Sequence, residues 1–481
     1  MMTAAVMALV AWGALAFGAV YPWAYTPLLA GCALVGALGL LLNRTKPFPC
    51  GTGPATLALV VVLAAGLLQL VPLPSTVLRT ISPSTLEFLQ RYTVGYDDAS
   101  HPLSLVPQST AIGLAFLACF TLLLAGLTAA LSRSGVRRLA QSLVAFGVLL
   151  ALVGIIQKAT LGEHAWGGMK IYGFWTPVNL LSTPFGPYVN KNHFAGWMLM
   201  GLPLALGFAL GLAEQGTRHI SSGWRSFILW FSSPEGGKLQ LTLLAIVFMS
   251  ASLLMTKSRS GVGGLAIAVL LVSVIAGRRF GSKRAGLAAL MTLAILFVVV
   301  LGLADSDFTS RVTNRMSAVE LRKNIWSDSA VVIRDFPLAG TGLNTFGTAM
   351  LTYQTVQHDQ HFQEAHNDYL QLLVEGGMLI ALPALAALVL IARVVYRRFA
   401  SGEDDTLTYW IRVGATVGLV AVAAQAFLEF SLQMPGNAAM AVVLLAIALH
   451  HPPTRRRRSG GNAKRQTPKR QTFGASNDHG L

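Results

Sequence analysis

Charged residues are scarce in this sequence. Asp, Glu, Lys and Arg make up only 12% of its 481 residues, whereas hydrophobic residues make up 54%. A soluble globular domain carries roughly twice that charged fraction. Apolar runs of about 17–25 residues, long enough to cross a bilayer as helices, recur along nearly the whole chain. The composition therefore excludes an ordinary soluble protein and predicts an all-α, polytopic membrane helical bundle.

Cysteine is nearly absent as well. The three copies, Cys32, Cys50 and Cys119, lie in or beside apolar segments. We therefore expect neither a disulfide framework nor a cysteine-based metal site. No Lys or Arg precedes Arg44, and a cleaved signal peptide requires a basic region before its apolar core. This absence argues against a cleaved signal peptide at the N-terminus.

The apolar runs predict about twelve membrane spans. They cover residues 4–20, 24–42, 55–72, 110–131, 139–157, 193–212, 239–255, 262–276, 286–303, 366–395, 409–429 and 438–450. The predicted regions are spans one to five (1–157), spans six to nine (158–303), one large loop between spans nine and ten (304–365), spans ten to twelve (366–450) and a tail (451–481). The tail is polar and basic, and we expect it to be disordered.

Basic residues orient this map, because they gather in alternate connections between the spans. They are Arg44, Lys46, Arg133, Arg137, Arg138, Arg218, Arg225, Arg278, Arg279, Lys283, Arg284, Arg397, Arg398 and Arg455 to Arg458. By the positive-inside rule these connections and both termini are cytoplasmic. The large loop then faces the other side, which is the periplasm if the protein lies in a bacterial inner membrane.

The large loop is nevertheless rich in arginine, against the topological rule. Its arginines are Arg311, Arg315, Arg322 and Arg334. Long loops are translocated regardless of their charge, so the cluster supports a binding role without proving one. A guanidinium has a planar fork that suits phosphate or carboxylate.

The pattern of this loop predicts a helix from about residue 311 to 333. One face is formed by Arg315, Val319, Arg322, Trp326, Ser329 and Ile333. Helical periodicity therefore places Arg315 and Arg322 on the side that packs against the membrane domain. The hypothesis is a diphosphate clamp. The alternative is a structural salt bridge to Glu320, Asp328 or Asp335.

Arg259 is a second candidate phosphate ligand. It lies with Lys257 in a tight turn between spans seven and eight, which the orientation places on the same side as the large loop. Two basic residues in so short an external connection are unusual. The alternative is contact with lipid headgroups.

His366 stands where the chain enters span ten. Neutral imidazole is a usable general base at pH 7, and Asn367 and Asp368 are residue types that begin helices. The alternative is an interfacial histidine with only a structural role. Glu364, Glu375 and Glu429 are other candidates; the last two lie inside predicted spans, where ionisable groups are costly and usually functional.

Other polar motifs are weaker. His358, His361 and His366 suggest zinc, but their spacing matches no standard zinc pattern. Asp305 and Asp307 resemble a metal–phosphate pair and arise easily by chance. The segment from Asn190 to Ala195, with amides at Asn190 and Asn192, binds sugar hydroxyls in one interpretation and caps a helix in the other. The turn at 340–342 does not complete a nucleotide-binding glycine motif.

Taken together and in order, several short motifs give the chain a family resemblance. They are Asn190-Lys-Asn-His-Phe-Ala-Gly196, Thr256-Lys-Ser-Arg-Ser-Gly261, Arg322 to Trp326, Pro337-Leu-Ala-Gly-Thr-Gly-Leu-Asn-Thr-Phe346, Ala365-His-Asn-Asp-Tyr-Leu370 and Glu375-Gly-Gly377. The stretch from about 158 to 435 resembles the O-antigen ligase and polysaccharide polymerase family of bacterial membrane glycosyltransferases.

The resemblance implies a glycosyltransferase C-like helical bundle with a large periplasmic loop over its site. It implies transfer of a glycan from undecaprenyl diphosphate to a sugar hydroxyl of lipid A–core or of a lipid-linked glycan, with inversion. The catalytic roles carry over to His366, Arg322 and Arg259, and Arg311 and Arg315 are candidate substrate-binding residues. No metal or cofactor is expected, because arginines supply the electrostatic stabilisation.

The other substrate-binding candidates come from the residues themselves: the amides of Asn190 and Asn192 and the carboxylate of Glu375. Nucleic-acid binding is not expected, because the basic tail has no interleaved aromatic residues. The alternative function is a twelve-span transporter or flippase of a lipid-linked glycan. It predicts two similar halves, and the sequence contains no evident internal repeat.

Overall fold

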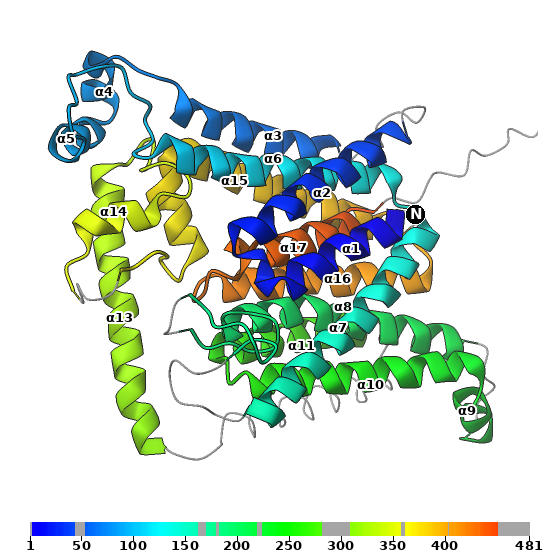
Figure 1. Ribbon diagram of the computed structural model, residues 1–481. Coiled ribbons are helices and arrows are strands. Elements are labelled where there is room, and N and C mark those ends of the chain that lie inside the picture. Colours follow the sequence, from blue (N-terminus) through cyan, green and yellow to red (C-terminus); the bar gives the residue numbers. More distant parts are fainter. Residues whose placement is uncertain are drawn as a thin grey trace, which may run out of the picture. The chain divides into compact units, whose positions relative to one another are not determined.

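A computed structural model describes residues 2–43, 53–161, 170–178, 182–218, 224–280, 308–356, 361–402 and 404–450. Apart from three isolated bridges, the regular structure within these ranges is helical and contains no strand. The predicted all-α class is therefore confirmed for this part of the chain (Figure 1).

Sixteen helices are described along the chain. They are α1 (Met2–Leu15), α2 (Pro22–Leu41), α3 (Gly53–Leu67), α4 (Ser75–Ile81), α5 (Pro83–Tyr92), α6 (Pro107–Ala130), α7 (Arg133–Leu161), α8 (Lys191–Thr217), α9 (Trp224–Phe231), α10 (Pro234–Met255), α11 (Arg259–Phe280), α13 (Phe308–Asp335), α14 (Phe346–Tyr353), α15 (Asp368–Ala400), α16 (Thr406–Gln425) and α17 (Pro435–Ala448). Three single 3-10 turns, η1 (Phe17–Ala19), η2 (Leu68–Leu70) and η3 (Ser431–Gln433), complete the set.

Nine of the described helices are long and apolar enough to cross a membrane. They are α2, α3 with η2, α6, α7, α8, α10, α11, α15 and α16. Two further apolar helices, α1 and α17, are shorter and coincide with the first and last expected spans. The expected span at 286–303 lies outside the described residues. The chain is thus a multi-pass membrane protein.

Several helices begin where the sequence supplies a local signal. The side chains of Asn190, Asn367 and Asp405 accept hydrogen bonds from backbone N–H groups in the first turns of α8, α15 and α16. Proline occupies the first position of α6 and α17, at Pro107 and Pro435. Both devices accommodate the backbone donors that a helix start leaves unpaired.

Helix α8 lies at the centre of the bundle, packed along α16 (Figure 1). The two backbones approach each other closely because small residues face the contact. A Cβ atom on Gly207 would lie 2.2 Å from the carbonyl oxygen of Trp410, and one on Gly414 would lie 2.4 Å from that of Pro203. This contact joins the elements that supply Asn192 and, just after α16, Glu429.

The large loop is largely helical. Helix α13 buries Ile325, Ser329 and Val332, and Phe336 directly after it is buried as well. These residues form a stripe at helical spacing that packs with α14 and with the beginning of α15. The predicted face, which contained Trp326 and Ile333, is offset from this stripe by about one residue. Its packing partners lie on distant segments, so the local pattern alone could not fix the register.

Candidate functional site

His366 is held in a constrained backbone position just before α15. Its φ angle is +50°, a region that residues other than glycine seldom adopt and that often marks functional sites. Neighbouring bonds maintain it: the N–H of Ala365 donates to Gln371 Oε1 at 3.0 Å, and Trp326 Nε1 donates to the Ala365 carbonyl at 2.9 Å. Asn367 caps the helix that follows. The sequence prediction that His366 lies at this helix boundary is confirmed.

A buried carboxylate, Glu429, is the centre of the site. It lies between α16 and η3, and only 2% of its side chain is exposed. Its Oε1 accepts hydrogen bonds from Arg322 Nη2 at 2.6 Å and from Asn192 Nδ2 at 2.8 Å. Its Oε2 lies 3.5 Å from His366 Nδ1. Residues from α13, α8 and the turn before α15 therefore converge on one carboxylate.

This environment keeps Glu429 anionic. Burial acts to raise the pKa of its carboxyl, but the contact with His366 and the positive charge of Arg322 outweigh burial and hold the pKa below its usual range. A carboxylate facing Nδ1 favours the tautomer with its proton on Nδ1. The lone pair then lies on Nε2, which is the arrangement that a general base requires.

A cavity of about 1340 Å³ adjoins His366. It exceeds the ~300–1,000 Å³ of usual small-molecule sites. Its polar lining includes Asn190, His193, Asn344, His361, Glu364, His366, Asp368, Gln371, Glu375 and Gln433. Its apolar lining includes Tyr25, Val62, Ile112, Phe116, Leu117 and Phe120, which belong to α2, α3 and α6. The cavity can therefore accommodate a large ligand with a polar part and an apolar part.

Arg259 begins α11 close to this cluster, although it does not line the cavity. A Cβ atom on Gly261 would lie 2.7 Å from the Cβ of Ala195, so the start of α11 packs tightly on α8. Gln425 Nε2 donates to Ser260 Oγ at 3.4 Å and to the Asn192 carbonyl at 3.2 Å. The residue next to Arg259 is thus linked through one side chain to Asn192, and the Arg259 side chain is exposed.

The remaining arginines of the large loop differ from Arg322. Arg311 and Arg315 lie on α13, but their side chains are outside the described part, so their role in substrate binding stays a prediction. Arg334 Nε donates to Asp335 at 3.1 Å and is largely exposed. Arg322 does form a carboxylate pair, as the alternative interpretation required, but with Glu429 rather than with any of the three acids considered.

Asn190 and Asn192 have different roles in the protein itself. Asn190 Oδ1 caps α8 by accepting the N–H of Asn192 at 2.9 Å, and Asn190 also lines the cavity. The amide of Asn192 is directed to Glu429. The helix-cap interpretation therefore applies to Asn190, whereas Asn192 helps to hold the central carboxylate.

Glu375 anchors the glycine-containing turn to α15. Its carboxylate accepts hydrogen bonds from the N–H groups of Asn344 at 2.8 Å and Phe346 at 3.1 Å, and from Gln371 Nε2 at 3.1 Å. Gly340 has φ +65°, and a Cβ on Gly377 would lie 2.5 Å from the Gly340 nitrogen. The conformation and the close approach both require glycine.

Two residues near His366 were underestimated from the sequence. From the sequence, Glu429 is only an alternative candidate. The one signal for it is an acidic residue inside an apolar run. His193 was not considered, because it lies within an apolar helix start. It is buried, and its Nε2 has no hydrogen-bond partner within the described ranges. The rings of His193 and His366 both contact the ring of Phe430 in a T-shaped arrangement, with centroid distances of 4.6 and 4.9 Å.

Of the residues considered for metal binding, the structure describes His361 and His366. His361 Nε2 lies 2.7 Å from the Gly347 carbonyl oxygen and borders the cavity. His358, Asp305 and Asp307 lie outside the described residues. Within the described part of the chain, no three His, Cys, Asp or Glu side chains are grouped closely enough to hold a metal ion.

Comparison with known proteins supports the resemblance given by the motifs. Residues 244–382 match a family model described as O-antigen ligase. No curated protein matches the chain. The matched region includes Arg259, Arg322, His366 and Glu375, whereas Asn192 and Glu429 lie outside it. Residues 244–382 of this membrane protein are therefore similar to the O-antigen ligase family.

Proposed function

We propose that this protein is an inner-membrane glycosyltransferase that moves a glycan from undecaprenyl diphosphate to a sugar hydroxyl. The acceptor is lipid A–core in a ligase or a lipid-linked glycan in a polymerase, and the site faces the periplasm. The observation that carries the proposal is the convergence of His366, Arg322 and Asn192 on Glu429 beside a cavity of mixed polarity.

In the proposed reaction, His366 acts as the general base. Its Nε2 accepts the proton of the acceptor hydroxyl while that oxygen attacks the anomeric carbon of the donor sugar. The bond from the anomeric carbon to the diphosphate oxygen breaks, and its electron pair leaves with the diphosphate. Glu429 stabilises the imidazolium that forms. Attack opposite the leaving group inverts the anomeric configuration.

Arg322 and Arg259 stabilise the departing diphosphate. A guanidinium carries five N–H donors. Glu429 accepts one hydrogen bond from Nη2 of Arg322, so other N–H groups of this guanidinium can bind phosphate oxygens. Arg259 supplies a second positive charge from the start of α11. Stabilisation of charge that develops in the transition state is usually the largest catalytic contribution, which is why we assign the arginines to the leaving group.

The apolar lining of the cavity suits the polyprenyl chain of the donor. Aromatic and aliphatic side chains from α2, α3 and α6 contribute to it, and His361, Glu364 and Gln433 contribute polar groups. A lipid-linked glycan likewise combines an apolar chain with a polar head. This correspondence supports a lipid-linked donor.

The test is glycan transfer by purified protein in vesicles that contain undecaprenyl-diphosphate-linked glycan and an acceptor. We expect His366→Ala to lower the initial rate by about 10²–10⁴-fold, the usual contribution of general acid–base catalysis. The matched control is His101→Ala, because this histidine neither lines the cavity nor contacts Glu429; we expect its rate to stay within a few-fold of wild type.

Full activity of His366→Ala would refute the base assignment. A cellular experiment separates transfer from transport: in a strain lacking the gene, a transferase leaves lipid-linked glycan accumulated on the periplasmic side. Accumulation on the cytoplasmic side would instead support the flippase alternative.

A further inference from the structure

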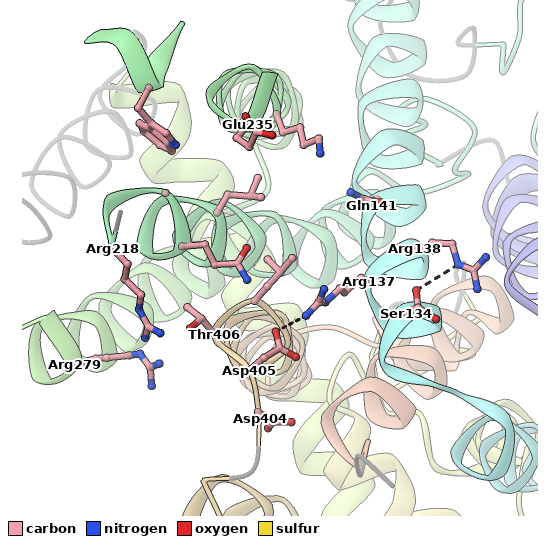
Figure 2. A pocket seen from close by; sticks show the side chains of 16 residues that line it. Ser134, Arg137, Arg138, Gln141, Arg218, Glu235, Arg279, Asp404, Asp405 and Thr406 are labelled. Carbon is pink, nitrogen blue, oxygen red and sulfur yellow. Dashed lines mark hydrogen bonds and ion pairs between the residues drawn. The ribbon is translucent and has the colours of Figure 1, made fainter. Parts of the chain in front are cut away.

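A second cavity, of about 1010 Å³, lies near the end of the bundle opposite His366. The His366 site adjoins the first residues of α8 and the last residues of α16, whereas this cavity is lined by Gln215 and Arg218 at the end of α8 and by Thr406 and Leu407 at the start of α16. Figure 2 shows it between α7, α8, α10 and α16.

The lining of this cavity is predominantly cationic. Its charged side chains are Arg137, Arg138, Arg218, Lys238, Arg279, Glu235, Asp404 and Asp405. Five cations and three acids give the lining a net charge of +2. Two buried side chains are paired with residues of this lining: Glu214 with Arg218 and Arg279, and Arg412 with Asp404. They add one charge of each sign and leave the balance unchanged.

The acids around the cavity are largely used by neighbouring arginines. Glu214 accepts hydrogen bonds from Arg279 Nε at 2.8 Å and Nη2 at 3.1 Å, and it also pairs with Arg218. Asp405 pairs with Arg137 Nη2 at 2.5 Å (Figure 2). These pairs hold three guanidinium groups at the cavity without removing its positive balance.

Two cations of the lining remain available to a ligand. Arg138 and Lys238 are both exposed, and neither forms an ion pair with any residue that the structure describes. Arg138 Nε donates to the Ser134 carbonyl at 3.4 Å (Figure 2). Its other N–H donors can reach a phosphate oxygen, because a guanidinium carries five of them.

The outer wall of the cavity carries the features of a membrane interface. Trp230 of α9 lines the cavity, and its neighbours Ile228 and Leu229 are exposed. On α10, exposed Leu241, Leu244 and Val247 follow Lys238 at helical spacing. Exposed apolar stripes on spanning helices face lipid tails, and basic and aromatic residues at their ends lie at headgroup level. We infer that Lys238 and Trp230 lie at the depth of lipid phosphates.

We propose that this cavity binds the phosphate group of an anionic membrane phospholipid, whose acyl chains run along the exposed stripe of α10. Basic pockets between spanning helices on the cytoplasmic side suit such headgroups. The chain's own tail is a poor occupant, because Arg455 to Arg458 carry the same sign of charge as the cavity. The proposal does not depend on the catalytic assignment of His366.

The experiment titrates full-length protein in mild detergent with phosphatidylglycerol, with phosphatidylcholine of the same acyl chains, and with inorganic phosphate. Native mass spectrometry counts bound lipid. We expect saturable binding of phosphatidylglycerol, and an at least roughly tenfold weakening in the double variant Arg138→Gln, Lys238→Gln, from about 1 kcal/mol for each surface charge. The matched control is Arg393→Gln, Arg397→Gln, which removes two exposed arginines from α15 near the same end of the bundle.

The outcomes distinguish a lipid phosphate from a soluble phosphate compound. Equal binding of the two lipids, or equal weakening of binding in both double variants, would refute the proposed lipid site. Competition by inorganic phosphate at concentrations comparable to the lipid would assign the cavity to a soluble phosphate compound and refute the phospholipid as its ligand. Circular dichroism checks that the variants fold. If the double variant does not fold, Arg138→Glu alone is titrated, and unchanged phosphatidylglycerol binding by it would also refute the proposal.

Discussion

Two buried glutamates, one toward each end of the bundle, hold arginine side chains in different surroundings. Glu214 binds Arg279 and Arg218 and accepts the indole N–H of Trp410 at 2.6 Å. Glu429 binds Arg322 and Asn192 and faces the ring of His366. A carboxylate–arginine pair is common to both ends. Only the Glu429 cluster also contains an imidazole, the side chain that most often acts as a general acid or base.

The comparison explains why arginine clusters alone do not identify a catalytic site. Buried ion pairs occur for structural reasons and contribute little net stability after desolvation. Glu214 of α8 is joined to α11 through such a pair with Arg279 and to α16 through the hydrogen bond from Trp410. At Glu429 the same kind of pair lies next to a strained histidine and a cavity. The combination, rather than the pair, distinguishes the end of the bundle that we propose to be catalytic.

The largest expected difference between the two ends comes from neutralising each glutamate. We expect Glu429→Gln to lower the transfer rate by about 10²-fold or more, because the imidazolium of His366 loses the charge that stabilises it. Glu214→Gln, the matched variant, should leave the rate within about fivefold while lowering stability, since removing one partner of a buried pair is destabilising. Initial rates and thermal unfolding of both variants measure this. An equal loss of rate in Glu429→Gln and Glu214→Gln would refute the assignment of a catalytic role to the Glu429 end alone.

A smaller effect is expected from changing the shape of one cation. Arg322→Lys keeps the charge but loses the planar fork, so it cannot bond Glu429 and a phosphate oxygen in the same way. We expect the transfer rate to fall by roughly tenfold, the equivalent of one hydrogen bond to a charged group. The control is Arg334→Lys, whose guanidinium pairs with Asp335 away from the cavity. Retention of full activity in Arg322→Lys would argue against a fork contact.

The smallest effect concerns pH and stability. Because the folded-state pKa of Glu429 lies below its ordinary value, its ionised form stabilises the fold. That contribution is complete above the unfolded-state pKa of about 4.3 and is lost as the pH falls through the lower folded-state pKa. The difference in unfolding temperature between wild type and Glu429→Gln should therefore be constant from pH 7 to about pH 5 and shrink below about pH 4. A constant difference down to pH 3 would contradict the assignment.

Local patterns predicted much of the fold. Apolar runs located the long helices, and the residue types at 190 and 367 correctly indicated helix starts. The limit is visible in Glu429: the sequence places it inside an expected span, whereas α16 ends at Gln425 and the chain turns, with the N–H of Glu429 bonded to the Gln425 carbonyl. An apolar run does not show where a helix turns.

The candidate site was predicted only in part for a related reason. His366 and Arg322 were identified singly, but their common partner lies 107 residues beyond Arg322. No local periodicity reports such a pairing. Glu375 is a second example. The sequence shows that an ionisable side chain stands inside an expected span, where it is energetically costly. It does not show that this carboxylate bonds the N–H groups of Asn344 and Phe346, because those residues lie in a turn about 30 residues earlier.

The contact between Gly340 and Gly377 makes the intervening chain a closed loop. Its ends touch through backbone atoms, so their separation is set independently of the residues between them, and closing the loop incurs the same entropy cost for any replacement of equal length. The segment carries His361 and Glu364, which line the cavity. The glycine contact therefore holds both ends of the chain that forms this wall of the cavity, and α14 between them is held by packing against α13.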